Sequence, residues 1–256
     1  MQLVILAGGK GTRLGYETDL IPKPMVRVGP FPIIWHIMKY YACFNVKDFI
    51  ICIGHNGYVL KEFFLNYRYH FNDFTINLKN GKAILDNNVL EDWNVTLVET
   101  GLDTQTGGRI KQIEKYIKND CFFMTYGDGL SNVNIKSLLK THQEQNKVAT
   151  VTSVIPPGRF GLLKNKGNKV IKFSEHTSEA EPNTNGGFFV LNKNIFKYTH
   201  NHETIFEQNI MVDLIEDKEL VTYHHKGFWQ PMDTVRDKIT LDSLWYKKEA
   251  PWKIWK

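Results

Sequence analysis

Short apolar runs alternate with amphipathic segments along the first 147 residues of the chain. Residues 3–7, 49–53, 95–98 and 121–126 are apolar without polar alternation, which is typical of strands covered on both faces. Apolar residues recur at helical spacing between these runs, at residues 33–41, 58–67, 110–117 and 133–142. Strands that alternate with helices predict right-handed βαβ units around a mostly parallel sheet.

The pattern changes after residue 147. Strand-like runs at residues 148–154, 169–173 and 187–191 have fewer helical segments between them, which predicts a smaller β-rich lobe on the same core. Residues 70–93 are polar and are interpreted as an irregular insertion. The last residues, 238–256, begin as a helix and contain Trp252 and Trp255, so we expect this tail to dock on the body or on a neighbouring subunit.

Composition narrows the class of protein. The chain has 256 residues, of which 42% are hydrophobic, so it can build a large core and is not globally disordered. The net charge of +5 is small. The sequence contains no apolar run of about 18 residues, so we expect no membrane span. The chain has three cysteines, which is an odd number, and their spacing is not that of a metal or redox site. We therefore expect reduced thiols in the core and a cytoplasmic location.

A glycine-rich loop, Gly-Gly-Lys-Gly-Thr-Arg-Leu at residues 8–14, follows the first predicted strand. Such a loop at the carboxyl end of a parallel strand lets backbone N–H groups approach phosphate oxygens. The loop lacks the Gly-Lys-Ser/Thr ending of a P-loop, and Leu14 replaces the third glycine of the dinucleotide fingerprint. A plain glycine-rich turn with an exposed Arg13 is the alternative.

Three charged residues outside this loop are candidates for phosphate and metal chemistry. Lys23 lies between two prolines that stiffen its backbone, which suits a developing phosphate charge; a solvated lysine in a polyproline-like turn is the alternative. Asp128 follows a predicted strand between two glycines, and Asp233 follows Pro231 in a second constrained turn. Two such carboxylates can hold Mg²⁺ together with phosphate oxygens, or each can simply cap its turn.

The glycine-rich loop followed by Pro-Lys-Pro-Met at residues 22–25 resembles the signature of the sugar-phosphate nucleotidylyltransferases. Other segments are similar to the cytidylyltransferase branch of that family, in order along essentially the whole chain: residues 35–39, 48–52, 106–109, 126–129, 156–161, 185–190, 227–234 and 250–253. The resemblance implies a Rossmann-like, mostly parallel mixed sheet flanked by helices in one domain, residues 1–256. Residues 1–147 would bind the nucleotide, residues 148–237 the acceptor, and residues 238–256 would form a tail with a possible oligomer contact.

The resemblance also implies a reaction. CTP and a sugar 1-phosphate, with α-D-glucose 1-phosphate as the first expectation, would give a CDP-sugar and diphosphate by in-line, Mg²⁺-assisted attack on the α-phosphorus. It further implies a homo-oligomer that makes activated sugars for surface polysaccharides such as O-antigen or capsule, without a nucleic-acid or membrane partner.

The family motifs assign roles to residues of this chain. The implied catalytic residues are Arg13, Lys23 and Asp128, and the implied metal ligands are Asp128 and Asp233. The implied nucleotide-binding residues are Leu6, Ala7, Gly8, Gly9, Gly11, Thr12, Arg13, Thr106, Gly108, Arg109, Tyr126 and Gly127. The implied acceptor-binding residues are Arg159, Glu175, His176, Asn185 and Gly186. For Arg109 the alternative is a surface arginine at a helix N-terminus, and for Arg159 a brace within its loop.

The acceptor half departs from the family pattern. His176 stands where the family has the lysine that meets the sugar phosphate, and Asn209-Ile210 replaces a usual Glu-Pro. Four hypotheses therefore stay open: transfer from CTP to glucose 1-phosphate, transfer with another nucleotide or another phosphorylated acceptor, a non-catalytic nucleotide-binding homologue, and a nucleic-acid binder. The presence of Arg13, Lys23 and both aspartates argues against the third, and the scattered basic residues argue against the fourth.

Overall fold

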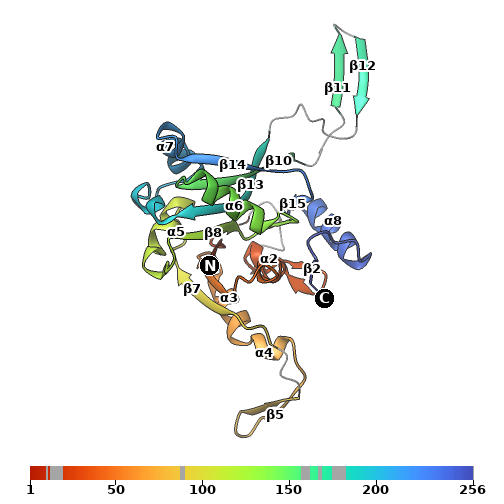
Figure 1. Ribbon diagram of the computed structural model, residues 1–256. Helices are drawn as coiled ribbons and strands as arrows, with labels where there is room; N and C mark the ends of the chain where they lie inside the picture. The colour runs from red at the N-terminus through yellow and green to blue at the C-terminus, as the bar shows by residue number, and fades with distance from the viewer. Residues whose placement is uncertain are drawn as a thin grey trace.

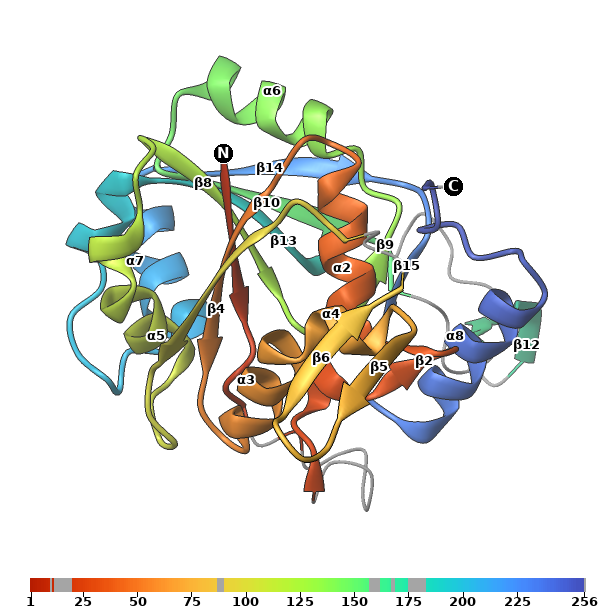
Figure 2. The same ribbon diagram turned by 90° about the horizontal axis from the view of Figure 1, so that it is seen from below.

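The computed structural model describes residues 1–9, 11, 20–86, 90–156, 162–166, 169–174 and 183–255. Its centre is a seven-stranded sheet in the order β14-β10-β13-β8-β1-β4-β7 (Figures 1 and 2). The strands are β1 (Gln2–Leu6), β4 (Asp48–Ile53), β7 (Asn94–Glu99), β8 (Cys121–Tyr126), β10 (Ala149–Val154), β13 (Thr184–Asn192) and β14 (Leu220–His225). The four strands expected in the first half of the chain are therefore confirmed.

The central strand β1 is parallel to both of its neighbours, β4 and β8. The chain continues from β1 to β4 and then β7 on one side, and returns later to β8 on the other side. Only β13 runs antiparallel to its neighbours, β8 and β10, while β10 and β14 are parallel. This confirms the mostly parallel mixed sheet and leaves a crevice at the carboxyl ends of β1 and β8, where the strand order reverses.

Helices cover both faces of the sheet. In Figure 2, α5 (Thr106–Gln112) and α7 (Met211–Glu216) lie on one side of β1 and β4, and α2 (Ile33–Ala42) lies on the other. Successive residues of β1 follow these layers: Leu3 and Ile5 belong to one buried cluster, and Val4 and Leu6 to the second. Burial on both faces is the reason why this strand shows no polar alternation in the sequence.

The other α-helices of the described residues are α3 (Gly57–Leu65), α4 (Tyr67–His70), α6 (Ile135–Gln145) and α8 (Val235–Tyr246). Of these, α6 packs on β10, β13 and β14, and its buried apolar residues belong to the same cluster as most of those of α2. Short strand pairs are β2 (Arg27–Val28) with β3 (Phe31–Pro32) and β9 (Gly129–Ser131) with β15 (Trp229–Pro231). Among the described residues, no helix has both the length and the apolar character that a membrane span requires.

Two hairpins extend away from the body (Figure 1). One consists of β11 (Leu162–Lys166) and β12 (Lys169–Ser174), and the other of β5 (Phe74–Asn77) and β6 (Lys82–Leu85). The expectation of an irregular segment at residues 70–93 was therefore wrong, because cross-strand pairing of two four-residue strands orders its centre. Phe74, Ile76 and Ile84 of this hairpin are exposed.

The three cysteines are free thiols, as expected. Cys52 is buried and Cys121 is half-buried, but Cys43 is exposed just after α2. The expected core position was therefore wrong for Cys43. It follows the last turn of its helix, where the chain turns towards β4 rather than into the core.

The C-terminal tail docks on the body of its own chain. Trp252 is fully buried and stacks on Phe228, and the Trp255 ring packs against Trp35. The Trp252 indole N–H donates to Nδ1 of His36 over 3.3 Å, which requires the proton of this imidazole to lie on Nε2, where it is donated to the Val28 carbonyl over 2.8 Å. Burial lowers the pKa of His36 to about 4.

This neutral histidine makes stability sensitive to acid. The pKa of His36 is lower in the folded chain than its ordinary value of 6.5, so the unfolded chain takes up the proton first as the pH falls from about 6.5 to about 4. We expect this group to remove on the order of 2 kcal/mol of unfolding free energy between pH 7 and pH 5. Chemical denaturation at both pH values measures the loss.

His36→Gln keeps a donor for the Val28 carbonyl but does not titrate, so its loss between the two pH values should be smaller. Burial also lowers the pKa of His142 and His225, which leaves part of the acid sensitivity in that variant. Replacement of the exposed His200 by Gln is the matched control and should keep the wild-type loss. An equal loss in the His36→Gln variant would contradict the assignment.

Candidate active site

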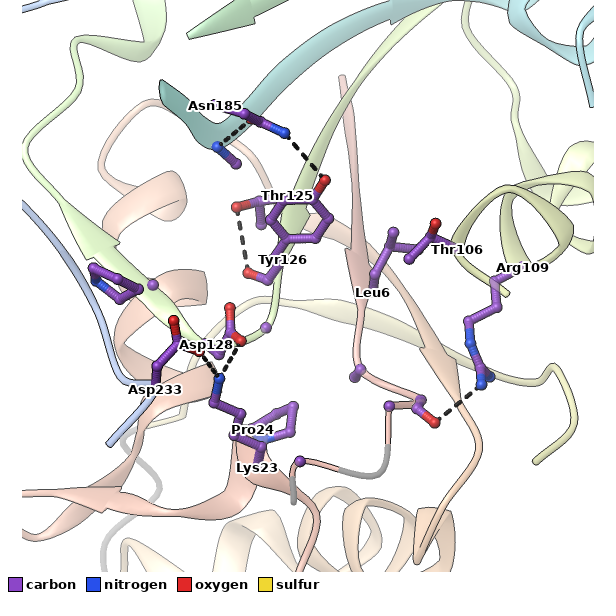
Figure 3. Close-up of a pocket in the computed structure, with 18 of the residues that line it drawn as sticks. Leu6, Lys23, Pro24, Thr106, Arg109, Thr125, Tyr126, Asp128, Asn185 and Asp233 are labelled. Atoms are coloured by element: carbon purple, nitrogen blue, oxygen red, sulfur yellow. Dashed lines mark hydrogen bonds and ion pairs between the residues drawn. The ribbon is translucent and has the colours of Figure 1, made fainter. Parts of the chain in front are cut away.

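A cavity of about 660 Å³ opens at the carboxyl ends of β1 and β8 (Figure 3). The sequence-predicted residues that line it are Leu6, Ala7, Gly8, Gly9, Gly11, Lys23, Thr106, Arg109, Tyr126, Gly127, Asp128, Asn185, Gly186 and Asp233. Gly108 is not among the lining residues, because its backbone N–H donates to the Thr204 carbonyl and its Cα faces His202. Thr12, Arg13, Arg159, Glu175 and His176 lie outside the described residues.

The centre of the charged wall is an ammonium group between two carboxylates. Nζ of Lys23 donates to Oδ2 of Asp128 over 2.6 Å and to Oδ1 of Asp233 over 2.7 Å (Figure 3). The three side chains are 12%, 30% and 24% exposed, so this pairing is partly desolvated. Burial alone would lower the pKa of Lys23, but attraction and hydrogen bonds from Asp128 and Asp233 outweigh it and raise the pKa above its ordinary value.

The fold brings these three residues together from distant parts of the chain. Lys23 begins the 3-10 helix η2 (Lys23–Met25), which is entered from Pro22 and contains Pro24. Asp128 directly precedes β9, which pairs with β15, and the Met232 N–H donates to the Asp128 carbonyl over 2.8 Å. This short ladder sets Asp233 beside Asp128 although 105 positions separate them in the chain.

The local backbone favours a charged site over the simpler alternatives. Lys23 is not a solvated lysine, because its side chain is 12% exposed and paired. Thr234 and Asp237 cap the N-terminus of α8 by forming a reciprocal capping box. The neighbouring Asp233 is therefore not the residue that caps this helix. The two prolines restrict the backbone of Lys23, so the position of its ammonium depends on its side-chain torsions and on the two carboxylates that accept from it.

The carboxylates of Asp128 and Asp233 fit a hard divalent cation. Their oxygens converge on one cationic point, and carboxylate oxygen is a preferred ligand of Mg²⁺. No cluster of three or more His, Cys, Asp or Glu side chains suited to a metal occurs in the described part of the chain. Two carboxylates are enough, because Mg²⁺ leaves its other positions to phosphate oxygens and water.

Arg109 braces the glycine-rich loop from behind. Its side chain is buried, and Nη2 donates to the Gly8 carbonyl over 3.0 Å while Nη1 donates to Oγ1 of Thr100 and to the Gly101 carbonyl over 2.5 and 2.9 Å. Burial lowers the pKa of Arg109. The alternative of a surface arginine was therefore wrong. The described contacts of this guanidinium tie the ends of β1 and β7 to α5, the helix that carries it.

A hydrogen-bonded chain crosses the opposite wall of the cavity. Asn185 on β13 donates from Nδ2 to the Tyr126 hydroxyl over 3.3 Å, and this hydroxyl donates to Oε1 of Glu207. Oε2 of Glu207 accepts from the Thr106 hydroxyl at the start of α5 over 2.9 Å. Burial and the Glu207 carboxylate raise the pKa of Tyr126, so this phenol stays a donor. This row of hydrogen bonds connects Asn185, which is predicted to bind the acceptor, with Tyr126 and Thr106, which are predicted to bind the nucleotide.

Sequence reasoning assigned no role to Glu207 or Trp229, which also line the cavity. Glu207 lies in the short π-helix η5 (Phe206–Ile210), a conformation that the residue pattern does not reveal. Trp229 donates its indole N–H to the Gly186 carbonyl over 2.7 Å. The only available signal for Trp229 was its place in the Gly-Phe-Trp-Gln-Pro-Met-Asp-Thr segment, residues 227–234.

The close approach of Arg109 to Gly8 generates a stability prediction. An ideal Cβ on Gly8 would overlap the Arg109 guanidinium, whereas a Cβ on Gly9 would meet nothing within 4 Å. We expect Gly8→Ala to lower the unfolding free energy by about 1–3 kcal/mol through overpacking. Gly9→Ala, the matched control, should change it by less than about 0.5 kcal/mol. Chemical denaturation measures both, and equal stabilities would show that Arg109 is not seated against Gly8.

Comparison with known proteins agrees with this geometry. The family model for nucleotidyl transferases matches residues 2–245. Glucose-1-phosphate cytidylyltransferases of Salmonella typhimurium and Salmonella typhi are each 47% identical to this chain over 256 residues, which covers all of both chains. The solved structure of HddC from Yersinia pseudotuberculosis has the same fold, with a TM-score of 0.68 at 22% identity over 95% of this chain and 99% of that chain. The cavity with its glycine-rich loop and paired carboxylates therefore lies in a chain that belongs to the nucleotidyl transferase family.

Proposed function

We propose that this protein transfers a cytidylyl group from CTP to α-D-glucose 1-phosphate, which gives CDP-glucose and diphosphate. The observation that carries the proposal is one cavity in which Lys23 and two carboxylates face the glycine-rich loop. Full-length identity of 47% to glucose-1-phosphate cytidylyltransferases supports the choice of CTP and of this acceptor.

The chemistry requires no nucleophile from the protein. The attacking oxygen belongs to the phosphate of the sugar, which is ionised at neutral pH, so positioning and charge stabilisation provide the rate enhancement. Backbone N–H groups of the loop after β1 would bind the triphosphate, and Lys23 would stabilise the charge that gathers on the α-phosphate. Arg13, in the same loop of the sequence, is proposed to bind the leaving diphosphate.

A divalent cation, with Mg²⁺ as the proposed ion, would be held by Asp128 and Asp233. Bound there, it would neutralise charge on the phosphate oxygens of the nucleotide. The two carboxylates would hold the cation where β8 ends and α8 begins, in the same cavity that the Gly8 carbonyl held by Arg109 lines.

The far wall suits the uncharged parts of the substrates. Glu207 is an anion and would repel phosphate groups, but its carboxylate is satisfied by the hydroxyls of Tyr126 and Thr106. The half-buried Asn185 and the buried Gly186 beside it offer amide and carbonyl groups that suit sugar hydroxyls. The homo-oligomer and the cytoplasmic location stay predictions of the sequence.

A substrate panel tests the proposed reaction. We expect diphosphate release with Mg²⁺, CTP and glucose 1-phosphate to exceed release with UTP, dTTP or ATP by at least about tenfold, because a site that hydrogen-bonds one base leaves polar groups unpaired with another. Turnover with CTP and only another phosphorylated acceptor would contradict the proposed acceptor. Binding of CTP without turnover on any acceptor would support the non-catalytic alternative.

Asp128→Asn tests the charged wall within this reaction. Loss of one carboxylate at the proposed cation site should lower kcat by about 10²–10³-fold, the range found for the loss of one preorganised electrostatic group. Asp92→Asn, at an exposed carboxylate that pairs with Lys47, is the matched control and should keep kcat within about twofold. Steady-state diphosphate release measures both variants. Wild-type kcat in Asp128→Asn would rule out a catalytic role for this carboxylate.

Glu207→Ala tests the one residue of this hydrogen-bonded row that the sequence did not reveal. The substitution removes the acceptor for the Tyr126 and Thr106 hydroxyls, so we expect kcat/KM to fall by about tenfold or more, equivalent to roughly 1.4 kcal/mol or more. The exposed Glu203 on the neighbouring turn provides the control, Glu203→Ala, which should leave kcat/KM unchanged. A wild-type kcat/KM in Glu207→Ala would mean that Tyr126 and Thr106 hold their positions without it.

A further inference from the structure

The ammonium group of Lys23 lies at the point where a metal ion bound by Asp128 and Asp233 would lie. Nζ is 2.6 Å from Oδ2 of Asp128 and 2.7 Å from Oδ1 of Asp233, so both carboxylates are directed at the same position. Figure 3 shows Nζ between the two side chains at the wall of the cavity. Each aspartate therefore accepts a hydrogen bond from the lysine ammonium with one of its carboxylate oxygens.

An ammonium and a divalent cation cannot share this position. Mg²⁺ binds carboxylate oxygens at about 2.0–2.1 Å, inside the distances that Nζ now keeps to the same oxygens. Two cations in such contact also repel each other strongly where water is partly excluded. A metal ion that uses both of these oxygens must therefore take the place of the ammonium.

We infer that Lys23 is a tethered cation that exchanges with the metal. Without metal, its ammonium offsets part of the negative charge of the two carboxylates; with metal, the ammonium is released into the cavity, where the phosphates of the substrates bind. This inference rests on the proposed metal role of Asp128 and Asp233 and adds an order of events to it. The metal thus has two effects: it binds at the carboxylates, and it frees a positive charge for phosphate.

The backbone around Lys23 suits such an exchange. Pro22 and Pro24 restrict the main chain, and the Met25 N–H donates to the Pro22 carbonyl over 2.8 Å. The lysine stem has four rotatable bonds, so the ammonium can leave the carboxylates while its Cα stays in place. The movement is therefore confined to one side chain.

The exchange predicts that Lys23 competes with metal in the nucleotide-free protein. We would titrate the full chain with Mn²⁺ alone and follow free Mn²⁺ by electron paramagnetic resonance. Lys23→Met removes the competitor and should tighten Mn²⁺ binding at least fivefold. Lys23→Arg keeps the charge and should stay within twofold of wild type. Lys47→Met removes the same charge from an exposed ion pair with Asp92 and should also stay within twofold.

Two results would overturn the inference. Equal or weaker Mn²⁺ binding in Lys23→Met would mean that ammonium and metal bind side by side, and undiminished binding in Asp128→Asn would place the metal elsewhere. If Lys23→Met is unstable because Asp128 and Asp233 lose the lysine ammonium, Mn²⁺ should raise its Tm more than that of wild type; an equal rise would also overturn the exchange. No nucleotide is present, so the result is independent of whether CTP turns out to be the substrate.

Discussion

The position of β1 at the centre of the sheet, with parallel neighbours on both sides, is the constraint on which the site depends. Because β4 and β8 lie on opposite sides of β1, the chain leaves the carboxyl ends of β1 and β8 in opposite directions, towards β4 and towards β10, and the space between these two ends stays uncovered. The Gly127 N–H donates to the Leu6 carbonyl over 3.1 Å and joins the ends of β1 and β8 where the cavity begins. Residues just beyond these two strand ends therefore face one space, although more than a hundred positions separate them in the chain.

The same constraint explains why a buried arginine stands behind the loop. Three carbonyls and a hydroxyl from the ends of β1, β4 and β7 surround the Arg109 guanidinium, so its cost of burial is offset by hydrogen bonds rather than by a described carboxylate contact. A positive charge held this way fixes the Gly8 carbonyl. It also leaves positive potential behind a loop whose proposed ligand is a polyphosphate.

The sequence predicted the layers of the fold well because burial on both faces leaves a clear pattern. Apolar runs without alternation marked the buried strands β1, β4 and β8, and also the half-buried edge strand β7. Periodic segments marked α2 and α6 close to their observed bounds. The hairpin β5–β6 was missed because its side chains are largely exposed and its stability comes from backbone pairing, which leaves little hydrophobic pattern.

Site residues that lie in short sequence motifs could be predicted. Site residues whose position depends on tertiary packing could not. Lys23 and Asp128 stood out because proline or glycine flanks them, and Asp233 because it follows Pro231 closely. The structure brings all three together. The burial of Arg109 could not be predicted, because it follows from the meeting of three strand ends. Glu207 could not be predicted either, because a single carboxylate in a π-helix has no sequence signature. The roles of Thr12, Arg13, Arg159, Glu175 and His176 stay predictions.

The net charge of the described residues that line the cavity affects how two anionic substrates can enter it. Its charged lining residues are the cations Lys23 and Arg109 and the anions Asp128, Asp233 and Glu207, so anions exceed cations by one. Lys23 is engaged by two of those anions, and Arg109 by backbone groups. Phosphate must therefore bring positive charge as a bound metal or find it in the loop that carries Lys10 and Arg13. In the proposed reaction, repulsion from Glu207 would confine the phosphates between the aspartate pair and the glycine-rich loop. The hydroxyl-bearing parts of both substrates would then lie towards Tyr126 and Asn185.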